Sequence, residues 1–418
     1  MKIAIIGSGI SGLSCAYLLN PHHQITLYEQ NDYLGGHSRT LEVNVQGTQV
    51  PVDTGFIVFN KRNYPNLTHL FQHLNVNIAK SKMSFGVSIN DGYLEYGTSN
   101  LLSLFAQGSN VMRMQYWKMV AEILRFNRLA IGFVERNPEA SIEQMLDRLK
   151  FGDWFRQYYI LAMAGAIWST PVSHMLRFPA KTLVQFFDQH GLLTVKDQPQ
   201  WYTVKGGSRE YVKAIADGLD GNYRLNCGVK QVIRKESGVD ITDQRDQTEH
   251  YDHVILACHS DQALAMLDQP SATEQQILGN IHYQPNKVIL HSDISFMPKR
   301  KRAWSSWVYL ANDHSVDHPS IRLSYWMNNL QPLATDSPLI VTLNPSHKPD
   351  PALIHDECIL HHPVFDLSAI KAQKRMAEIQ GAGNVWYCGA WNRYGFHEDG
   401  LLSAISVAKQ LGVKIPWE

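Results

Sequence analysis

Residues 2–12 read KIAIIGSGISG, a short apolar run followed by three glycines at G-x-G-x-x-G spacing. The apolar run predicts a buried β-strand, and a helix is expected to open at about Ser11. Gly7 would permit the tight turn between strand and helix, Gly9 would let a pyrophosphate approach the backbone, and Gly12 would let the helix pack close to the strand. Free N–H groups at the N-terminus of such a helix attract phosphate oxygens.

An acidic residue follows the next apolar run. The segment QITLYE predicts a second strand that ends at Glu29. A carboxylate at this place can accept hydrogen bonds from both ribose hydroxyls of an adenosine, and it would repel a 2′-phosphate. The strand, the glycine turn, the helix and the acid together predict a dinucleotide-binding βαβ unit.

Two adjacent glycines indicate which dinucleotide is bound. Gly35 and Gly36 lie in YLGGHS, shortly after Glu29. Adjacent glycines let the chain pass close to ribose and pyrophosphate, as in FAD-binding proteins of the glutathione-reductase type. A plain hairpin turn is the alternative. Because the pair follows Glu29, we favour FAD.

Composition limits the class of protein. A chain of 418 residues can bury a large core, and we expect two domains. Lys plus Arg and Asp plus Glu both total 38, so no nucleic-acid partner is expected. No apolar run reaches the roughly 20 residues of a membrane span. The glycines of the first segment belong to the nucleotide turn, so we expect no signal peptide.

Cysteines and histidines give little sign of disulfides or metal. The five cysteines form no CxxC pair and are typical of reduced thiols, so we expect a cytoplasmic protein. His22-His23 and His361-His362 have no second ligand cluster nearby in the sequence. We interpret both pairs as surface or turn residues and expect no metal site.

The pattern along the chain predicts a discontinuous FAD-binding domain. We assign residues 1–80, 200–266 and 366–418 to it, and residues 81–199 and 267–365 to a substrate domain with a helical insertion. The expected elements are a strand or turn at 51–60, helices at 64–74 and within 101–157, a helix after the glycine turn in 205–219, a hairpin in 224–242, strands at 253–260, 286–293, 303–310, 320–327, 339–344 and 384–391, and a helix at 400–411. The strands between 267 and 365 suggest a sheet that forms the floor of a substrate cavity.

The motifs resemble one known family over essentially the whole chain. GSGISGLS, YLGGHS, VDTGFIVFN, KGGSREYV and CGAWNRYGFHEDGL occur in this order. The chain resembles the flavin-containing amine oxidase superfamily, and within it a bacterial branch of amine-oxidase-like, predicted NAD/FAD-binding proteins. That branch is similar to the oxidase-like half of some plant cyclopropane fatty acid synthases and to flavoproteins that desaturate acyl chains. The resemblance implies an α/β fold: a Rossmann-type, glutathione-reductase-like FAD-binding domain with a mixed α+β substrate domain.

The resemblance also assigns residues to the cofactor. The positions that would hold FAD are Gly7, Gly9, Ser11, Gly12 and Glu29 at the ADP half, Gly35, Gly36, His37 and Ser38 at the ribose and pyrophosphate, Val229 at the adenine, and Gly389, Asp399 and Leu401 at the ribityl chain and flavin. The helix opened by Asp399–Leu401 would direct its positive end at the N1–C2=O edge of the flavin.

Two departures from the family pattern concern the cofactor. His37 stands where amine oxidases carry an arginine against the pyrophosphate, so that contact is weaker or comes from elsewhere, for example from Arg39. No cysteine matches the flavin-tethering position, because Cys388 precedes Gly389 and belongs to the strand. The resemblance therefore implies non-covalent FAD.

Two residues are candidates for catalysis. Lys287 matches the lysine that amine oxidases place near flavin N5 through a water, and the alternative is an exposed lysine at a strand end. His397 replaces one aromatic wall of the amine-guiding cage and would bring an imidazole that can move protons beside the flavin. Its alternative role is a structural pair with Glu398.

The expected function is FAD-dependent oxidation of a C–H bond, with hydride transfer to flavin N5. We favour a lipid acyl chain as the substrate. The first alternative is oxidation of an amine or amino acid with release of hydrogen peroxide, in a pocket walled by Trp326, Trp391 and Tyr394. A carotenoid-type desaturase lies between the two. The alternative without catalysis is an FAD-binding structural partner of a lipid methyltransferase.

Two basic segments with aromatic residues suggest peripheral contact with a membrane. The first lies between Arg113 and Arg128, and the second is Lys299–Arg302 followed by Trp304 and Trp307. Basic clusters beside tryptophans suit an anionic membrane surface. A solvated loop and a core helix are the alternative. We therefore expect a cytoplasmic protein that can contact the inner membrane face.

Overall fold

A parallel five-stranded sheet is assembled from strands that are far apart in the sequence. The computed structural model describes residues 1–168, 175–194, 198–311, 322–345 and 347–418. The strand order is β10-β2-β1-β14-β20. Its members are β1 (Lys2–Ile6), β2 (Gln24–Tyr28), β10 (Tyr223–Arg224), β14 (His253–Leu256) and β20 (Val385–Tyr387). All four residues from Ile3 to Ile6 are buried, which is why β1 reads as a continuous apolar run.

Both faces of this sheet are covered. Ile3 and Ile5 pack into one core and Ala4 and Ile6 into another, because successive side chains of a strand point to opposite faces. The first core contains the helices α1 (Ile10–Leu19), α2 (Pro65–His73), α10 (Arg209–Asp217) and α15 (His397–Gln410). The second contains the antiparallel sheet β11 (Val229–Lys235), β12 (Gly238–Asp243) and β13 (Thr248–Tyr251), and the helices α11 (Ser260–Met266), α12 (Ala272–Leu278) and α14 (Leu367–Gln373).

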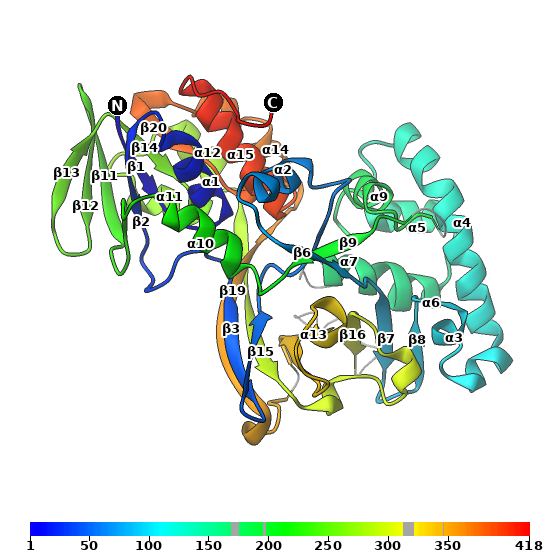
Figure 1. Ribbon diagram of the computed structural model, residues 1–418. Helices are drawn as coiled ribbons and strands as arrows, with labels where there is room; N and C mark the ends of the chain where they lie inside the picture. Colours follow the sequence, from blue (N-terminus) through cyan, green and yellow to red (C-terminus); the bar gives the residue numbers. More distant parts are fainter. Residues whose placement is uncertain (169–174, 195–197, 312–321, 346) are drawn as a thin grey trace.

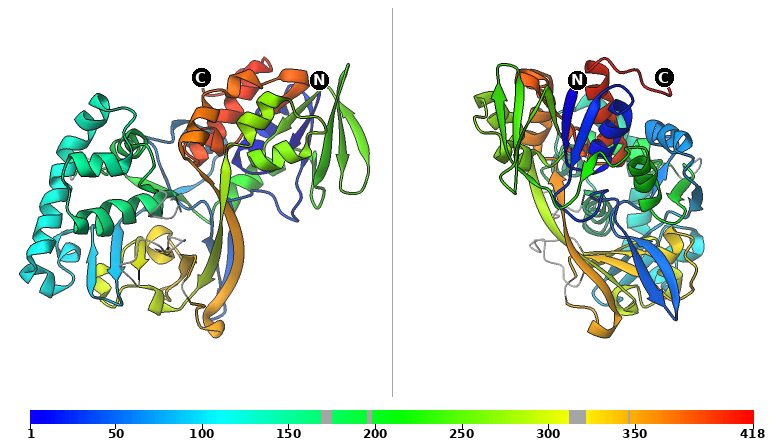
Figure 2. Two further views of the ribbon diagram at one scale, coloured as in Figure 1. Left: turned by 180° about the vertical axis from the view of Figure 1, so that it is seen from behind. Right: turned by 60° about the vertical axis from the view of Figure 1, so that its left-hand side comes forward.

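A seven-stranded sheet forms the second half of the molecule (Figure 1). Its order is β19-β15-β18-β17-β16-β7-β8. The strands are β7 (Phe85–Ile89), β8 (Leu94–Gly97), β15 (His282–His291), β16 (Trp307–Ala311), β17 (Leu323–Trp326), β18 (Ile340–Leu343) and β19 (Ile354–Val364). The long strands β15 and β19 pair antiparallel from His282–Val364 to His291–Ile354 and run from one half of the molecule to the other (Figures 1 and 2).

Helices α3 (Leu101–Leu104), α4 (Met114–Arg136), α5 (Ile142–Arg148), α6 (Asp153–Phe155), α7 (Leu161–Trp168) and α9 (Ala180–Gln189) lie together at one side of this half (Figure 1). The short helix α13 (Met327–Leu330) lies apart from them, after β17. A π-helical segment, Arg156–Ile160, joins α6 to α7. Two small sheets complete the fold, β3 (Thr40–Val45) with β4 (Thr48–Asp53), and β5 (Phe59–Asn60) with β9 (Trp201–Val204) and β6 (Ile78–Ser81). In Figure 1 and in the left view of Figure 2, α4 lies at the end of the molecule farthest from the parallel sheet.

The predicted fold class is confirmed. The five parallel strands fall within residues 1–80, 200–266 and 366–418, the ranges predicted for the FAD-binding domain. The division of the chain into two domains stays a prediction. The strand β19 was not expected from the sequence, because polar residues alternate along it and its exposure alternates too. The last helix begins at His397 and not at the expected residue 400. Ser320 and Ile321 of the strand expected at 320–327 lie outside the described residues. Within the described residues, no helix is both long enough and apolar enough to span a membrane.

Candidate functional site

A cavity of about 890 Å³ lies where the two halves meet. It begins at the carboxyl ends of β1, β2 and β14, the edge at which open parallel sheets bind their ligands. It continues to β15, β16, β17, β18 and β19 of the seven-stranded sheet. One continuous cavity is therefore shared by the dinucleotide-type half and the half predicted to bind substrate.

The glycine turn has the geometry predicted for a phosphate-binding loop. Gly7 has φ +99°, which favours glycine. A Cβ atom on Gly12 would lie 1.8 Å from the carbonyl oxygen of Gly7, so only glycine lets α1 pack this close. A Cβ atom on Gly9 would meet nothing within 4 Å, which leaves room for a pyrophosphate. Gly7, Gly9 and Ser11 line the cavity, whereas Gly12 lies behind them.

Glu29 is held in a fixed orientation at the edge of the cavity. Its Oε2 atom accepts hydrogen bonds from the backbone N–H of Ser8 at 3.0 Å and from the Ser8 hydroxyl at 2.5 Å. Its Oε1 atom accepts from the backbone and side-chain N–H groups of Asn31, both at 2.8 Å. The carboxylate is thus oriented before any ribose arrives, as a site for adenosine hydroxyls requires.

Gly35 and Gly36 form no hairpin turn. They have φ +120° and +57°, and a Cβ atom on Gly36 would lie 3.1 Å from the Cα of Gly9. The glycine pair therefore packs against the first glycine turn, and both glycines line the cavity. Ser38 lies just behind the cavity wall, where its hydroxyl bonds to Tyr211 and His397.

The two ends of a bound FAD would meet residues that are far apart in the chain. Val229 lines the cavity beside Cys227 and Gly228, where the adenine is expected. Gly389 lines it on the other side, where the ribityl chain is expected. The first turn of α15 reaches the cavity through Phe396 and His397. The positive end of this 14-residue helix thus faces the site.

Asp399 and Leu401 lie under this helix terminus, outside the cavity wall. The Oδ2 atom of Asp399 accepts hydrogen bonds from the backbone N–H groups of Tyr394 and Phe396 at 3.2 and 3.0 Å. Burial raises the pKa of Asp399 to about 6. Leu401 is fully buried in the core. Both residues fix the turn that presents α15, and the expectation of direct contact with FAD is wrong for their side chains.

His397 lines the cavity as a neutral imidazole. Its ring stacks on Phe56 with centroids 3.7 Å apart, and its Nε2 atom lies 3.0 Å from the Ser38 hydroxyl. Burial lowers its pKa to about 3. The alternative pair with Glu398 is wrong, because Glu398 accepts three hydrogen bonds from Asn66 and Leu67 at the start of α2.

Four histidines, His37, His259, His361 and His362, form a wall of the cavity that the sequence analysis did not foresee. The ring centroid of His37 lies 5.4 Å from that of His362 and 6.3 Å from that of His259. The interpretation of His362 as a surface or turn residue is wrong, because it is partly buried on β19 and reaches the cavity. His361, the preceding residue of β19, is exposed as expected and also lines the cavity. His259 follows β14 at the same sheet edge as Gly7. Because ligands bind at this edge of parallel sheets, its position after a predicted strand could have marked it as a cavity residue.

Burial keeps three residues of the histidine wall neutral, namely His37, His259 and His362. It lowers the pKa of His37 and of His259 to about 4 and that of His362 to about 3. The Nε2 atom of His37 is buried and has no hydrogen-bond partner among the described residues. An anionic oxygen of a pyrophosphate would satisfy such an atom. No cluster of three or more His, Cys, Asp or Glu side chains in the described part of the chain could hold a metal ion.

Arg39 cannot replace the missing arginine of the family pattern. Its guanidinium forms a two-pronged ion pair with Asp356 on β19, at 2.8 and 3.1 Å. It does not line the cavity, so the suggested contact with the pyrophosphate is wrong.

The predicted place of Lys287 is also wrong. Its side chain is 48% exposed and pairs with Glu357 at 3.0 Å. The next residue of β15, Val288, lines the cavity, and successive side chains of a strand point to opposite faces. The alternative, an exposed strand lysine, describes it correctly.

Only part of the predicted substrate pocket reaches the cavity. Trp391 and Tyr394 line it, but the Trp391 Nε1–H donates to the carbonyl of Cys258 on the dinucleotide side. Trp326 packs against Trp304 in a separate cluster and does not line the cavity.

The end of the cavity at the seven-stranded sheet is apolar. The residues that line it there are mostly apolar: Ile57, Val58, Ile167, Phe186, Val288, Trp307, Tyr325, Val341, Leu343, Ile359, Leu360, Phe365 and Phe396. His190 also lines this end, with its ring stacked on that of Phe186 at 3.7 Å. Among the described residues that line the whole cavity, Glu29 is the single Asp, Glu, Lys or Arg. It lies at the dinucleotide end.

These residues fit FAD without a covalent link. The glycine turn, Glu29 and the unpartnered Nε2 of His37 suit the ADP half, and α15 presents its N-terminus to the other end. Cys388 is fully buried, with its sulfur 3.7 Å from that of Cys15, and does not reach the cavity.

Comparison with known proteins gives the family. The family model described as flavin containing amine oxidoreductase matches residues 10–332. The zeta-carotene desaturase of Zea mays is 29% identical over 268 residues, 57% of this chain. The chain spans only 34% and 44% of the length of two curated desaturases that it matches.

Two solved structures share the fold. Cyclohexylamine oxidase from Brevibacterium oxydans IH-35A is 15% identical with a TM-score of 0.70, over 98% of this chain and 99% of that one. The CLA-producing fatty acid isomerase from P. acnes is 16% identical with a TM-score of 0.66, over 98% of both chains. The family match covers most of the chain and the cavity fits the cofactor. The chain therefore belongs to the flavin-containing amine oxidoreductase family, and its cavity fits FAD held without a covalent bond.

Proposed function

We propose that this protein removes a hydride from a C–H bond of a lipid acyl chain. The observation that carries the proposal is the distribution of charge in the cavity. Its one charged wall residue among the described residues, Glu29, lies at the ribose end. Beyond the dinucleotide site the described wall consists mostly of apolar side chains, with the imidazole of His190, whose pKa burial lowers to about 4, among them. An acyl chain is stabilised by burial against such a wall, at roughly 25 cal/mol for each Å² of apolar surface. A cationic amine would lose its hydration there without gaining a carboxylate partner.

The chain's own residues supply position and dry surroundings. FAD, when bound, accepts the hydride. Val288, Val341 and Leu343 come from adjacent strands of one sheet, so they can hold a substrate against a rigid surface. His397 is neutral at physiological pH because its pKa is about 3. It acts as a fixed hydrogen-bonding group with Ser38, and a bound water is the better carrier for the accompanying proton.

The known proteins of similar fold are consistent with either substrate class. One of the two solved structures above is named as an amine oxidase and the other as a fatty acid isomerase. The choice of an acyl chain therefore depends on the cavity wall and not on these likenesses.

Deletion of the gene separates the two substrate classes in the cell. Total fatty acids and polyamines of the deletion strain and its parent are compared by mass spectrometry. The proposal predicts that an unsaturated or otherwise modified acyl chain disappears and that its precursor, two hydrogens heavier, accumulates. A strain rescued with Leu360→Trp, which narrows the apolar end, should regain less product than a strain rescued with wild type. Unchanged lipids with an accumulated amine would show that the amine alternative is correct.

A further inference from the structure

Large apolar side chains are exposed at one corner of the molecule. Fourteen such side chains are exposed among the described residues, and eight of these lie between residues 101 and 131: Leu101, Leu102, Val111, Met112, Met114, Trp117, Leu124 and Ile131. Met112 is 90% exposed and Met114 is 85% exposed. Monomeric proteins rarely expose a cluster of this kind unless another surface covers it.

Contacts join these residues into one surface. The Trp117 Nε1–H donates to the carbonyl of Val111 at 2.8 Å, and the Trp117 ring lies 5.2 Å from that of Phe105. These contacts tie the short 3-10 helix η1 (Gly108–Met112) and α3 to the first turns of α4. Along α4, Trp117, Leu124 and Ile131 recur every seven residues and so lie on one stripe.

Basic residues lie among the apolar ones. Arg113, Lys118, Arg125 and Arg128 belong to the same segment. The one acid between Leu101 and Ile131 is Glu122, which is 7% exposed and accepts a hydrogen bond from the backbone N–H of Gly152 at 3.0 Å. The exposed face of this segment thus combines apolar and cationic side chains without an exposed carboxylate.

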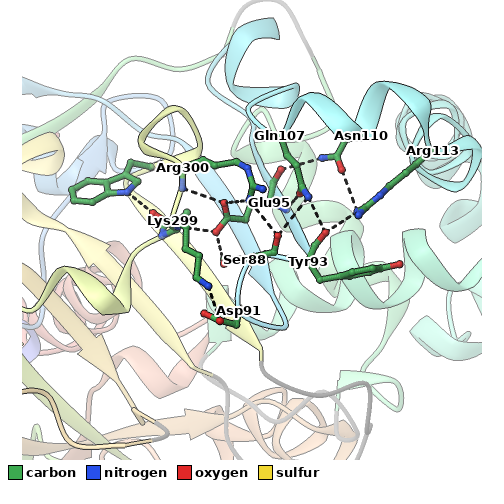
Figure 3. Close-up of polar contacts among 12 residues, drawn as sticks. Ser88, Asp91, Tyr93, Glu95, Gln107, Asn110, Arg113, Lys299 and Arg300 are labelled. Atoms are coloured by element: carbon green, nitrogen blue, oxygen red, sulfur yellow. Dashed lines mark hydrogen bonds and ion pairs between the residues drawn. The ribbon is translucent and has the colours of Figure 1, made fainter.

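The basic segment Lys299–Arg302 is bound to the same corner by hydrogen bonds and an ion pair (Figure 3). The carboxylate of Glu95 on β8 is fully buried and accepts hydrogen bonds from the backbone N–H of Lys299 at 2.8 Å and from the Arg300 guanidinium at 2.8 Å. Two residues before Glu95, the carbonyl of Tyr93 accepts a hydrogen bond from Arg113 at 2.7 Å. The hairpin of β7 and β8 therefore holds both basic segments together.

Only part of the second segment is free to meet a partner. Lys299 pairs with Asp91 at 2.6 Å, and Arg300 is committed to Glu95. Lys301 and Arg302 are exposed, and no ion pair engages them within the described residues. We call the exposed apolar side chains of residues 101–131, with Lys118, Arg128, Lys301 and Arg302, the apolar-basic surface.

We propose that the apolar-basic surface docks on an anionic lipid bilayer. Met112, Met114 and Trp117 would enter the head-group region, and Arg128, Lys301 and Arg302 would meet the lipid phosphates. A second copy of the chain fits less well, because a twofold contact would bring together two surfaces that both carry positive charge. The contact is interfacial, since no described helix can span a membrane. The proposal does not depend on the substrate.

The test is co-sedimentation of the FAD-loaded protein with vesicles. Wild type should bind phosphatidylglycerol vesicles at low salt, bind weakly to phosphatidylcholine vesicles, and lose binding as the salt concentration rises. The variant Arg128→Gln/Lys301→Gln/Arg302→Gln should lose affinity by roughly tenfold or more. Arg300 stays unchanged, because its removal would leave the buried Glu95 unpaired. Met112→Ser/Met114→Ser should also weaken binding, because both side chains are exposed and removing them disturbs no core.

Matched control variants remove the same kinds of side chain at positions outside the apolar-basic surface. Lys371→Gln/Lys374→Gln/Lys414→Gln removes three exposed charges in the other half of the molecule, and Ile294→Ser/Leu367→Ser removes two exposed apolar side chains outside the surface. Both controls should bind vesicles as wild type does, and all variants should keep the wild-type flavin spectrum. The proposal is overturned if wild type ignores anionic vesicles at low salt, or if the controls lose as much affinity as the surface variants. A different result would also overturn it: wild type is a dimer by gel filtration and binds no vesicles, and Met112→Ser/Met114→Ser converts the dimer to a monomer.

Discussion

The Nε2 atom of His397 lies 3.0 Å from the hydroxyl of Ser38, although the two residues are 359 positions apart in the chain. This contact joins the first turn of α15 to the loop that follows β2. The Ser38 hydroxyl also bonds to the hydroxyl of Tyr211, and the His397 ring stacks on Phe56. The end of α15 that faces the cavity is therefore held by hydrogen bonds that run from His397 to Ser38 and on to Tyr211, behind the cavity wall.

Loss of this contact should change the flavin and leave FAD in place. Ser38→Ala and His397→Ala should each alter the rate of flavin reduction or reoxidation in stopped-flow traces. The effect of the double variant should be smaller than the sum of the two single effects, because the two residues share one hydrogen bond. Additive effects, or traces identical to wild type, would show that the pair has no such role.

Replacing Glu29 should weaken FAD binding and also destabilise the FAD-free protein. The side chain accepts four hydrogen bonds from Ser8 and Asn31, so Glu29→Ala leaves buried donors unpaired, at a cost of about 1.5–3 kcal/mol. Glu29→Gln keeps the shape and some of the acceptors, so it should lose less stability. FAD dissociation constants and melting temperatures of the FAD-free proteins measure the two effects. Full FAD occupancy in Glu29→Ala would contradict the assignment of the ribose site.

The FAD-free protein should lose stability as the pH falls from about 6.5 to 4. Burial lowers the pKa of His37 from 6.5 to about 4, so the unfolded chain binds more protons than the folded chain in this window. Each such histidine contributes a slope of about 1.4 kcal/mol for each pH unit. His37→Gln should therefore make the dependence of the melting temperature on pH shallower. Bound FAD should do the same, because its pyrophosphate favours protonated His37. Equal slopes in wild type and His37→Gln would contradict this account.

Lys287→Met should behave as wild type in flavin reduction. The side chain pairs with Glu357 at 3.0 Å on the face of β15 that is turned away from the cavity, so its removal costs only an exposed ion pair. Stopped-flow reduction of the bound flavin measures the effect. A clear slowing would restore the role near flavin N5 that the family resemblance assigns.

Local signals in the sequence predicted the dinucleotide end well. Gly7, Gly12 and Gly36 take conformations or close contacts that only glycine allows, and such constraints can be read from spacing. The other end depends on contacts between distant segments. Lys287 and Val288 are neighbours on one strand, and no local pattern tells which of the two faces the cavity. His361 and His362 reach the cavity only because β19 pairs with β15, and that strand lacked a clear pattern.

Anaerobic reduction of the bound flavin tests the proposed activity most directly. The FAD-loaded protein is mixed without oxygen with phospholipid vesicles or free fatty acids, and separately with aliphatic amines, while the flavin absorbance is recorded. We predict that a lipid bleaches the flavin and that mass spectrometry finds an acyl product two hydrogens lighter, whereas amines leave the spectrum unchanged. Bleaching by an amine, with no reduction by any lipid, would contradict it.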